Sequence, residues 1–496
     1  MHAAVGSVGL PPAQARALVG REAVAWRRAV DALGSSRLAL GGLTAVFAAA
    51  GLALVLGQGI VSDEGLLTHV FARWLTLEPL AALFFQKIKP TVCVLYAVPS
   101  LGGAQSTLVA HVLVAALAAP MLATVARRLG LRWPNLPALL LLASPLYLFG
   151  AAAGVSNTDG VALSILVLYL TVARGWHWAA GLVLGSLPWV RSELAPLAAV
   201  LWLYMALIER NRGVALGALV IPLAYAMGGA VYHRDLLWLL HYAPTMAFPH
   251  PSNLVRSGSG GLHTLLWVLL LVTPAVGVAA LAPWRRLSPL ERALALGAAL
   301  TLLLVSLLPL WGLFNFDSSA RYSMQPLPVL ALLAARALEP LADGPHAAWG
   351  FAALPLLLLA ALSVSAGVPP ALGVLLIVAY AALAASAWRG AAPAAVVALA
   401  AIAGLGLALP RKELATPAYY AAALDWLEAN AADVRATTLY TSSAVLPYGI
   451  ARRAALDGTA VRFLVAPDMG WELEMLSNPH NGQRAALARA AAQELY

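Results

Sequence analysis

The chain has 496 residues, of which 61% are hydrophobic and only 11% are charged. Soluble domains usually carry about 25% charged and about 45–50% apolar residues, so the composition excludes a soluble enzyme, a disordered protein and a nucleic-acid-binding protein. It is typical of an all-α polytopic membrane protein. The formal net charge of +9 comes mostly from basic residues in short segments between apolar runs, a pattern typical of cytoplasmic loops. The single cysteine, Cys93, excludes an intrachain disulfide.

Residues 1–37 contain no early apolar core, which argues against a cleavable signal peptide. Arginines recur among apolar residues between 13 and 33, at roughly helical spacing. This spacing predicts an amphipathic helix on the inner membrane surface, and a solvated basic tail is the alternative. We assign 1–37 to a cytoplasmic amphipathic segment.

The transmembrane domain is predicted over 38–409, with roughly thirteen apolar runs of the length that crosses a bilayer. The predicted spans are 38–60, 104–126, 136–154, 158–173, 178–190, 194–208, 214–232, 262–282, 290–312, 322–338, 347–367, 370–387 and 391–409. Every loop that alternation places inside carries at least one arginine, so the N-terminus is expected in the cytoplasm and the C-terminus outside. The first outer loop, 61–103, is semi-polar and predicts short interfacial helices rather than a span.

The composition changes at 410, after which charged residues of both signs are frequent. Residues 417–430, 445–455 and 481–495 read as helices, and 437–441 and 461–465 read as strands. We therefore predict a small extracytoplasmic α/β domain over 410–496.

Two adjacent carboxylates, Asp63 and Glu64, directly follow the first predicted span. Charges near hydrocarbon are costly, so such a pair is a candidate for a catalytic site. A carboxylate at the outer membrane surface is suited to act as a general base. The alternative is a polar stop signal at the end of a helix.

Several cationic groups are predicted on the same outer side of the membrane. The candidate substrate-binding residues there are Lys87, Lys89, Arg191, Glu193, Arg321 and Tyr322. The lysines alone are equally typical of interfacial snorkelling, and an Arg191–Glu193 pair could be structural. Together, however, cations that stabilise a departing phosphate and a carboxylate that takes a proton are what transfer from a phosphate leaving group requires.

The predicted outer loop 232–262 is long and contains His241 and His250 among prolines. Long loops are often functional, so both histidines are candidates for acceptor binding. Their spacing matches no established metal motif, and we predict no metal site, although a divalent cation requirement stays open. His111 falls within a span and is interpreted as a packed group. Residues 156–159 are interpreted as an outer loop that caps the next helix.

These motifs resemble those of the GT-C membrane glycosyltransferases, in particular the protein O-mannosyltransferase and lipid A aminoarabinose transferase branch. Asp63-Glu64 resembles the family's acidic motif after the first span. The stretch through Lys89-Pro90, Tyr96 and Gly102-Gly103 is similar to its Lys-Pro-rich segment, and Arg321-Tyr322 to its later Arg-Tyr motif. The resemblance covers most of 38–340 and implies a GT-C-like fold.

The resemblance also implies an activity: inverting transfer of a hexosyl or pentosyl group from a polyprenyl-phosphate sugar to an extracytoplasmic lipid, glycan or protein. Asp63 would be the base with Glu64 beside it, and Lys87, Lys89, Arg191 and Arg321 would surround the lipid phosphate. The expected partners are this donor, the acceptor and membrane lipids, with no nucleic acid, and the expected location is the bacterial inner membrane of the cell envelope.

Other function classes remain open at this point. A transporter or flippase of a lipid-linked or anionic substrate would explain charges within the membrane, although it predicts an internal symmetry that is not seen. A polysaccharide ligase or polymerase would carry its site in a late outer loop instead of the first one. A structural scaffold would not need an outward cluster of both charge signs.

Overall fold

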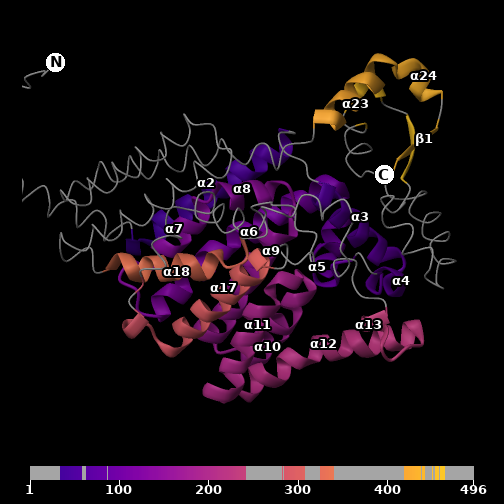
Figure 1. The fold of residues 1–496 in the computed structure, drawn as a ribbon. Coiled ribbons are helices and arrows are strands. Elements are labelled where there is room, and N and C mark those ends of the chain that lie inside the picture. Colours follow the sequence, from indigo (N-terminus) through magenta and orange to yellow (C-terminus); the bar gives the residue numbers. More distant parts are fainter. Residues whose placement is uncertain are drawn as a thin grey trace, which may run out of the picture.

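The structure is a computed structural model, and its described part is almost entirely helical (Figure 1). The described residues are 34–57, 63–85, 88–241, 282, 284–307, 324–339, 418–436, 438–441, 450, 453–456 and 459–463. The predicted cytoplasmic segment and the predicted spans at 262–282, 347–367, 370–387 and 391–409 lie essentially outside these residues.

Four helices in the described part are long and apolar enough to cross a membrane. They are α2 (Arg37–Leu56), α6 (Gly103–Arg128), the continuous helix formed by α9 (Ser156–Leu168) and η1 (Tyr169–Arg174), and α12 (Arg212–His233). Each coincides with a predicted span. The full number of spans stays a prediction.

The apolar run at 136–154, which was predicted as one span, is not one continuous helix. It forms two short helices, α7 (Leu136–Leu142) and α8 (Pro145–Ala152), with a break at Ser144. The hydroxyl of Ser144 accepts from the Tyr147 amide and caps α8, while Pro145 begins that helix without an amide hydrogen to donate. Hydropathy alone does not detect such a break, because the flanking residues are apolar on both sides.

The first predicted outer loop forms short helices, as expected. They are α3 (Asp63–Leu77), α4 (Pro79–Leu83) and α5 (Pro90–Ser100). Further along the chain, α10 (His177–Ser186) leads through the 3-10 turns η2 (Leu187–Trp189) and η3 (Ser192–Leu194) to α11 (Ala195–Leu203) and η4 (Tyr204–Ile208). The two 3-10 turns flank Arg191 and separate α10 from α11.

The remaining membrane-domain elements are α13 (Trp238–His241), η8 (Trp284–Arg286), α17 (Pro289–Leu307) and α18 (Leu327–Leu338). Arg336 in the last turn of α18 joins α6, α17 and α18. Its guanidinium donates to Glu291 at 2.8 Å and to the backbone carbonyl of Leu129, just after α6. Glu291 is almost fully buried, so this contact neutralises a charge that burial alone would penalise.

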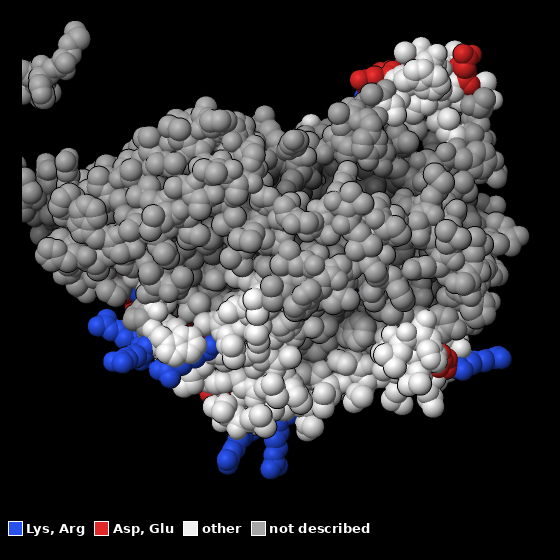
Figure 2. All heavy atoms as spheres, viewed as in Figure 1, with Lys and Arg blue, Asp and Glu red and all other residues white. Residues whose placement is uncertain are grey.

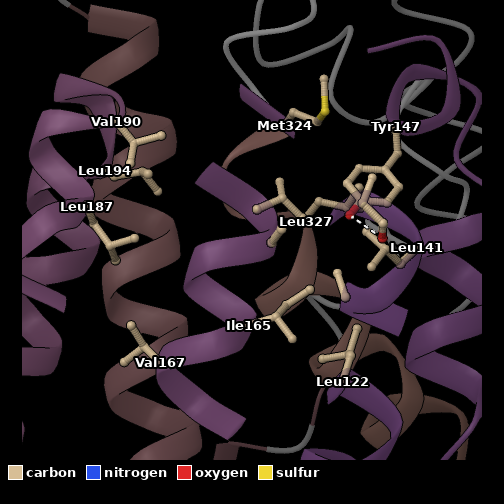
Figure 3. Packing of buried hydrophobic residues seen from close by; sticks show 14 of the residues in the cluster. Leu122, Leu141, Tyr147, Ile165, Val167, Leu187, Val190, Leu194, Met324 and Leu327 are labelled. Carbon is tan, nitrogen blue, oxygen red and sulfur yellow. Dashed lines mark hydrogen bonds between the residues drawn. The ribbon is translucent and has the colours of Figure 1, made fainter. Parts of the chain in front are cut away.

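The core is one large apolar cluster in which α6, α8, α9 and α18 pack closely. Figure 3 shows Leu122, Leu141, Ile165 and Leu327 converging within it. The ring of Tyr147 lies in the same cluster, and its hydroxyl donates to the Ala115 carbonyl at 3.0 Å. Small residues on α6 allow this close approach of helices, as is usual in membrane helix packing.

The C-terminal described elements are α23 (Ala418–Ala429), α24 (Ala431–Arg435), β1 (Thr438–Thr441), η12 (Ala454–Leu456) and β2 (Ala460–Phe463). The strands pair in parallel with Thr438 opposite Ala460, and both lie where strands were predicted. A small apolar cluster that includes Leu424, Val434 and Leu456 packs beside them. The predicted helix 481–495 lies outside the described residues, and an outer α/β domain stays a prediction.

Basic side chains gather at the ends of the helices rather than along them. In Figure 2 most of the Lys and Arg side chains in view lie along the lower edge, near the starts of α12 and α17, and others lie at the right beside α13. Acidic side chains lie over α23 and α24 and also beside α13. The spanning helices α6 and α9–η1 both end in arginine, at Arg128 and Arg174. The cytoplasmic side of these ends stays a prediction. The polar cluster described next includes Ser156 at the start of α9, the end of that helix opposite Arg174.

Candidate functional site

The carboxylate of Glu64, at the start of α3, is the centre of a polar cluster. One of its oxygens, Oε1, accepts from three donors: Lys89 Nζ, Ser156 Oγ and Arg191 Nη1, the last at 3.0 Å. Lys89 also donates to Ser156 Oγ at 2.8 Å. These residues come from four separate segments of the chain, so the fold itself assembles the cluster.

The position of Glu64 depends on the glycine that follows it. A Cβ atom at Gly65 would lie 2.1 Å from the carbonyl oxygen of Ala153, in the turn between α8 and α9. That turn contains Gly154 in the left-handed region, with φ of +69°, which favours glycine. The start of α3 therefore approaches the backbone before α9 as closely as only glycine permits, and this brings Glu64 beside Ser156.

Lys89 lies at the N-terminal boundary of α5, directly before Pro90. Proline disfavours the helical conformation in the preceding residue, so Lys89 is non-helical, with φ of −106° and ψ of 87°. Its side chain is 19% exposed. Burial and the neighbouring Arg191 guanidinium lower the pKa of Lys89 to about 8, and Glu64 opposes part of this shift.

Arg191 is held between two carboxylates. Its backbone is extended between η2 and η3, which directs the side chain into the cluster, where it is only 2% exposed. Nη1 donates to Glu64 and Nη2 donates to Glu193 at 2.7 Å. The two cations and two carboxylates of this cluster balance, which is what makes their burial tolerable.

A second polar layer lies one helical turn further along α9. Asp159 is 1% exposed, and its Oδ1 accepts from the Tyr96 hydroxyl and lies 3.1 Å from His111 Nδ1. The rings of Tyr96 and His111 are in contact, with centroids 3.8 Å apart and planes tilted by 31°. The side-chain amide of Asn157, also buried, has no hydrogen-bond partner within the described part of the chain.

These positions correct the prediction that 156–159 form an outer loop capping the next helix. The four residues are the first turn of α9 itself, all are buried, and no side chain among them caps the helix. Hydropathy placed the start of the span at 158, within this polar run, whereas α9 begins at Ser156. The side chains of Ser156 and Asp159 meet partners that are far away in the sequence: Glu64 and Lys89 for Ser156, and Tyr96 and His111 for Asp159. His111 is the packed, hydrogen-bonded group that was predicted.

The structure brings together Glu64, Lys89, Arg191 and Glu193 of the predicted site residues. Asp63 begins α3, immediately before Glu64, and only its place in the helix is described. His241 instead pairs with Asp235 at 2.6 Å on the exposed end of α13 and is no member of the cluster. Four further candidates, Lys87, His250, Arg321 and Tyr322, lie outside the described residues.

Sequence reasoning missed Ser156 and Asp159 as site residues. The available signal was the run of four polar residues at 156–159 between apolar stretches, since polar groups in a membrane core require partners. No group of three or more His, Cys, Asp or Glu side chains in the described part is placed to hold a metal ion. The cluster suits anion chemistry instead, because two cations and a hydroxyl converge on one oxygen position.

Comparison with solved structures gives a match over nearly the whole chain. The crystal structure of ArnT from Cupriavidus metallidurans in the apo state superposes with a TM-score of 0.55 and 17% sequence identity, covering 88% of this chain and 89% of that one. The chain has the fold of ArnT. The match confirms the overall fold that the sequence motifs implied, and the number of spans and the C-terminal domain stay predictions.

A second structure supports the same fold assignment. The crystal structure of ArnT from the same organism bound to undecaprenyl phosphate superposes with a TM-score of 0.54 and 16% identity, covering 89% of both chains. No protein-family model matches the sequence, and a comparison with curated proteins gives no match either. The similarity to ArnT at this identity concerns the fold, and the chemistry of this chain must be argued from its own residues.

Proposed function

We propose that the protein is an inverting glycosyltransferase that moves a sugar from a polyprenyl-phosphate donor to an acceptor on the extracytoplasmic side. The observation that carries this proposal is the convergence of Lys89, Arg191 and Ser156 on the single oxygen Glu64 Oε1. A phosphate oxygen needs the same kind of donor set. An ArnT structure binds undecaprenyl phosphate on the same fold, which supports a lipid phosphate as the ligand here.

In the proposed reaction, a hydroxyl oxygen of the acceptor forms a bond to the anomeric carbon of the sugar. The bond between that carbon and the phosphate oxygen breaks, and polyprenyl phosphate leaves with the electron pair. The hydroxyl proton passes to the carboxylate of Asp63. Attack opposite the leaving group inverts the anomeric configuration.

Lys89 and Arg191 stabilise the charge that develops on the departing phosphate. Glu64 holds the two cations on either side of one position, and Glu193 fixes the second arm of Arg191. Because these four charges balance, the phosphate charge requires further cations. Lys87 and Arg321 are proposed to supply them, with Tyr322 beside the donor and His241 and His250 on the acceptor side.

The test is a transfer assay with purified protein in nanodiscs. Radiolabelled polyprenyl-phosphate sugars serve as donors and a membrane extract provides the acceptor. Wild-type protein is expected to transfer label, and Asp63→Asn is expected to abolish transfer while undecaprenyl phosphate binding is retained. Asp433→Asn, a substitution on the exposed surface of α24, is the matched control.

Full transfer by Asp63→Asn would contradict the assignment of the base. No transfer by folded wild-type protein with any donor would contradict the proposed function. In that outcome, translocation of the lipid-linked sugar in proteoliposomes would test the transporter alternative.

A further inference from the structure

The contacts between α5 and α9 form two layers. In the outer layer, Lys89 at the start of α5 donates to Ser156 at the start of α9. In the inner layer, Tyr96 on α5 donates to Asp159 on α9. Tyr96 follows Lys89 by two helical turns and Asp159 follows Ser156 by one, so each pair of residues lies on one face of its helix.

The inner layer also includes a third helix. His111 on α6 lies 3.1 Å from the Asp159 carboxylate, and its ring contacts the ring of Tyr96. All three side chains are at most 1% exposed. The Asp159 carboxylate has no bulk water to replace a lost partner, which makes the geometry of these three groups strongly interdependent.

Asp159 lies one helical turn beyond Ser156 on α9 and, within the described part of the chain, is not in contact with the outer cluster. Its described side-chain contacts are to Tyr96 and His111, and neither Lys89 nor Glu64 is among them. Its effect on the outer cluster is therefore transmitted through the two helices on which Lys89 and Ser156 lie.

We propose that Tyr96, His111 and Asp159 are positioning residues that set the separation of α5 and α9, and thereby hold Lys89 and Ser156 on either side of Glu64. We call Tyr96, His111 and Asp159 the inner brace. It fixes the point at which Lys89 and Ser156 meet Glu64. The expected effect of the brace on the rate of sugar transfer rests on the proposed function, whereas its expected effect on the position and pKa of Lys89 does not.

The test compares two single-atom deletions. Tyr96→Phe removes the hydroxyl of the brace. Tyr147→Phe is the matched control, because Tyr147 is equally buried and its hydroxyl donates to the Ala115 carbonyl, so the substitution leaves the Tyr96 and His111 contacts of the Asp159 carboxylate in place. Each variant is purified in nanodiscs and checked for thermal stability before the functional measurements.

The first readout is the affinity for undecaprenyl phosphate, which requires no turnover. Tyr96→Phe is expected to weaken binding roughly tenfold, the effect of weakening one hydrogen bond to a charged group, while Tyr147→Phe binds as wild type. The kcat of sugar transfer is expected to fall by about 10- to 100-fold in Tyr96→Phe, because small displacements of a positioned group have large effects on rate.

The second readout follows Lys89 directly and separates the brace from the proposed function. Competitive acylation of lysine amines, read by mass spectrometry across pH, gives the titration of Lys89. Loss of the brace is expected to move the pKa of Lys89 from about 8 towards the ordinary value of 10.5, because burial is the main cause of its lowering. If wild-type protein binds or transfers nothing, this profile still decides the inference.

Identical Lys89 profiles and lipid affinities in Tyr96→Phe, Tyr147→Phe and wild type would overturn the inference. If Tyr96→Phe cannot be purified in folded form, Asp159→Asn replaces it, since it keeps the size and one acceptor oxygen. The inference is supported if Tyr96→Phe changes both the lipid affinity and the Lys89 titration while its thermal stability equals that of Tyr147→Phe.

Discussion

Replacing Arg191 with methionine is the most informative perturbation of the outer cluster. The methionine side chain keeps most of the apolar stem and removes the guanidinium, which is 2% exposed. Glu193, 1% exposed, then loses its cationic partner, and Glu64 keeps Lys89. Breaking a buried ion pair by removing one partner typically costs about 3–5 kcal/mol, so Arg191→Met is expected to lower the free energy of unfolding by about that amount.

The second variant is Arg191→Met combined with Glu193→Gln. Neutralising the stranded carboxylate is expected to recover about 1–3 kcal/mol, the usual interaction energy of groups in one network. Both Arg191→Met and the double variant are expected to lose undecaprenyl phosphate binding, because both lack the cation that is proposed to bind the phosphate. Recovery of stability without recovery of binding separates the structural role of Arg191 from its functional one.

The assay is unfolding in mixed micelles with increasing SDS, followed by circular dichroism, with lipid binding measured on the same samples. Arg453→Met is the matched control, since Arg453 also pairs with two carboxylates, Asp425 and Glu428, which are 71% and 45% exposed. Exposed pairs contribute at most about 1 kcal/mol, so this control is expected to change little. Equal stability losses in Arg191→Met and Arg453→Met, or no recovery in the double variant, would refute the reasoning.

Three further predictions concern other parts of the structure. Gly65→Ala places a Cβ 2.1 Å from the Ala153 carbonyl oxygen, so it is expected to lower the free energy of unfolding by about 1–3 kcal/mol and to weaken lipid binding. Gly41 has open space around it, so Gly41→Ala is the control and is expected to cause no destabilisation. Thermal denaturation compares the two variants. Lipid phosphate binding is expected to fall as pH rises through about 8, where Lys89 loses its proton, and Lys89→Arg is expected to remove that decline. The free energy of unfolding is expected to change in the opposite direction. Between pH 8 and 10.5 the unfolded chain keeps the Lys89 proton and the folded chain has lost it, so the contribution of Lys89 to stability becomes more favourable as pH rises. Arg336→Met strands the buried Glu291 and is expected to cost about 3 kcal/mol in SDS unfolding, with undecaprenyl phosphate affinity unchanged.

Much of the outer cluster could be predicted from the sequence, because a charged residue near hydrocarbon is costly and therefore indicates a structural or functional role. Glu64, Lys89 and Arg191 are charged groups at the ends of apolar runs, and a membrane protein retains such groups where they are paired or functional. Their convergence on one oxygen could not be predicted, because it depends on the close approach of Gly65 to the backbone of Ala153.

The start of α9 shows where hydropathy fails. A polar tetrapeptide reads as a loop when only neighbours in the sequence are considered, whereas in the fold it faces Glu64, Lys89, Tyr96 and His111. The same limitation hid the break at Ser144 within an apolar run. Average polarity over a window identifies spans, but helix ends depend on caps and on partners that the window does not contain.

The long separation in sequence between Glu64 and Arg191 has a consequence for biogenesis. The two residues are 127 positions apart, and Ser156 is 92 positions after Glu64. At a synthesis rate of about 5–20 residues per second, Glu64 precedes its arginine by roughly 6–25 seconds. During that interval Lys89, 25 positions after Glu64, is available to pair with the Glu64 carboxylate, but the turn at Ala153 on which the start of α3 packs emerges later in synthesis. Docking of α3 is therefore expected to wait for the turn at Ala153 to emerge from the ribosome, and the cluster around Glu64 is completed only when Arg191 follows.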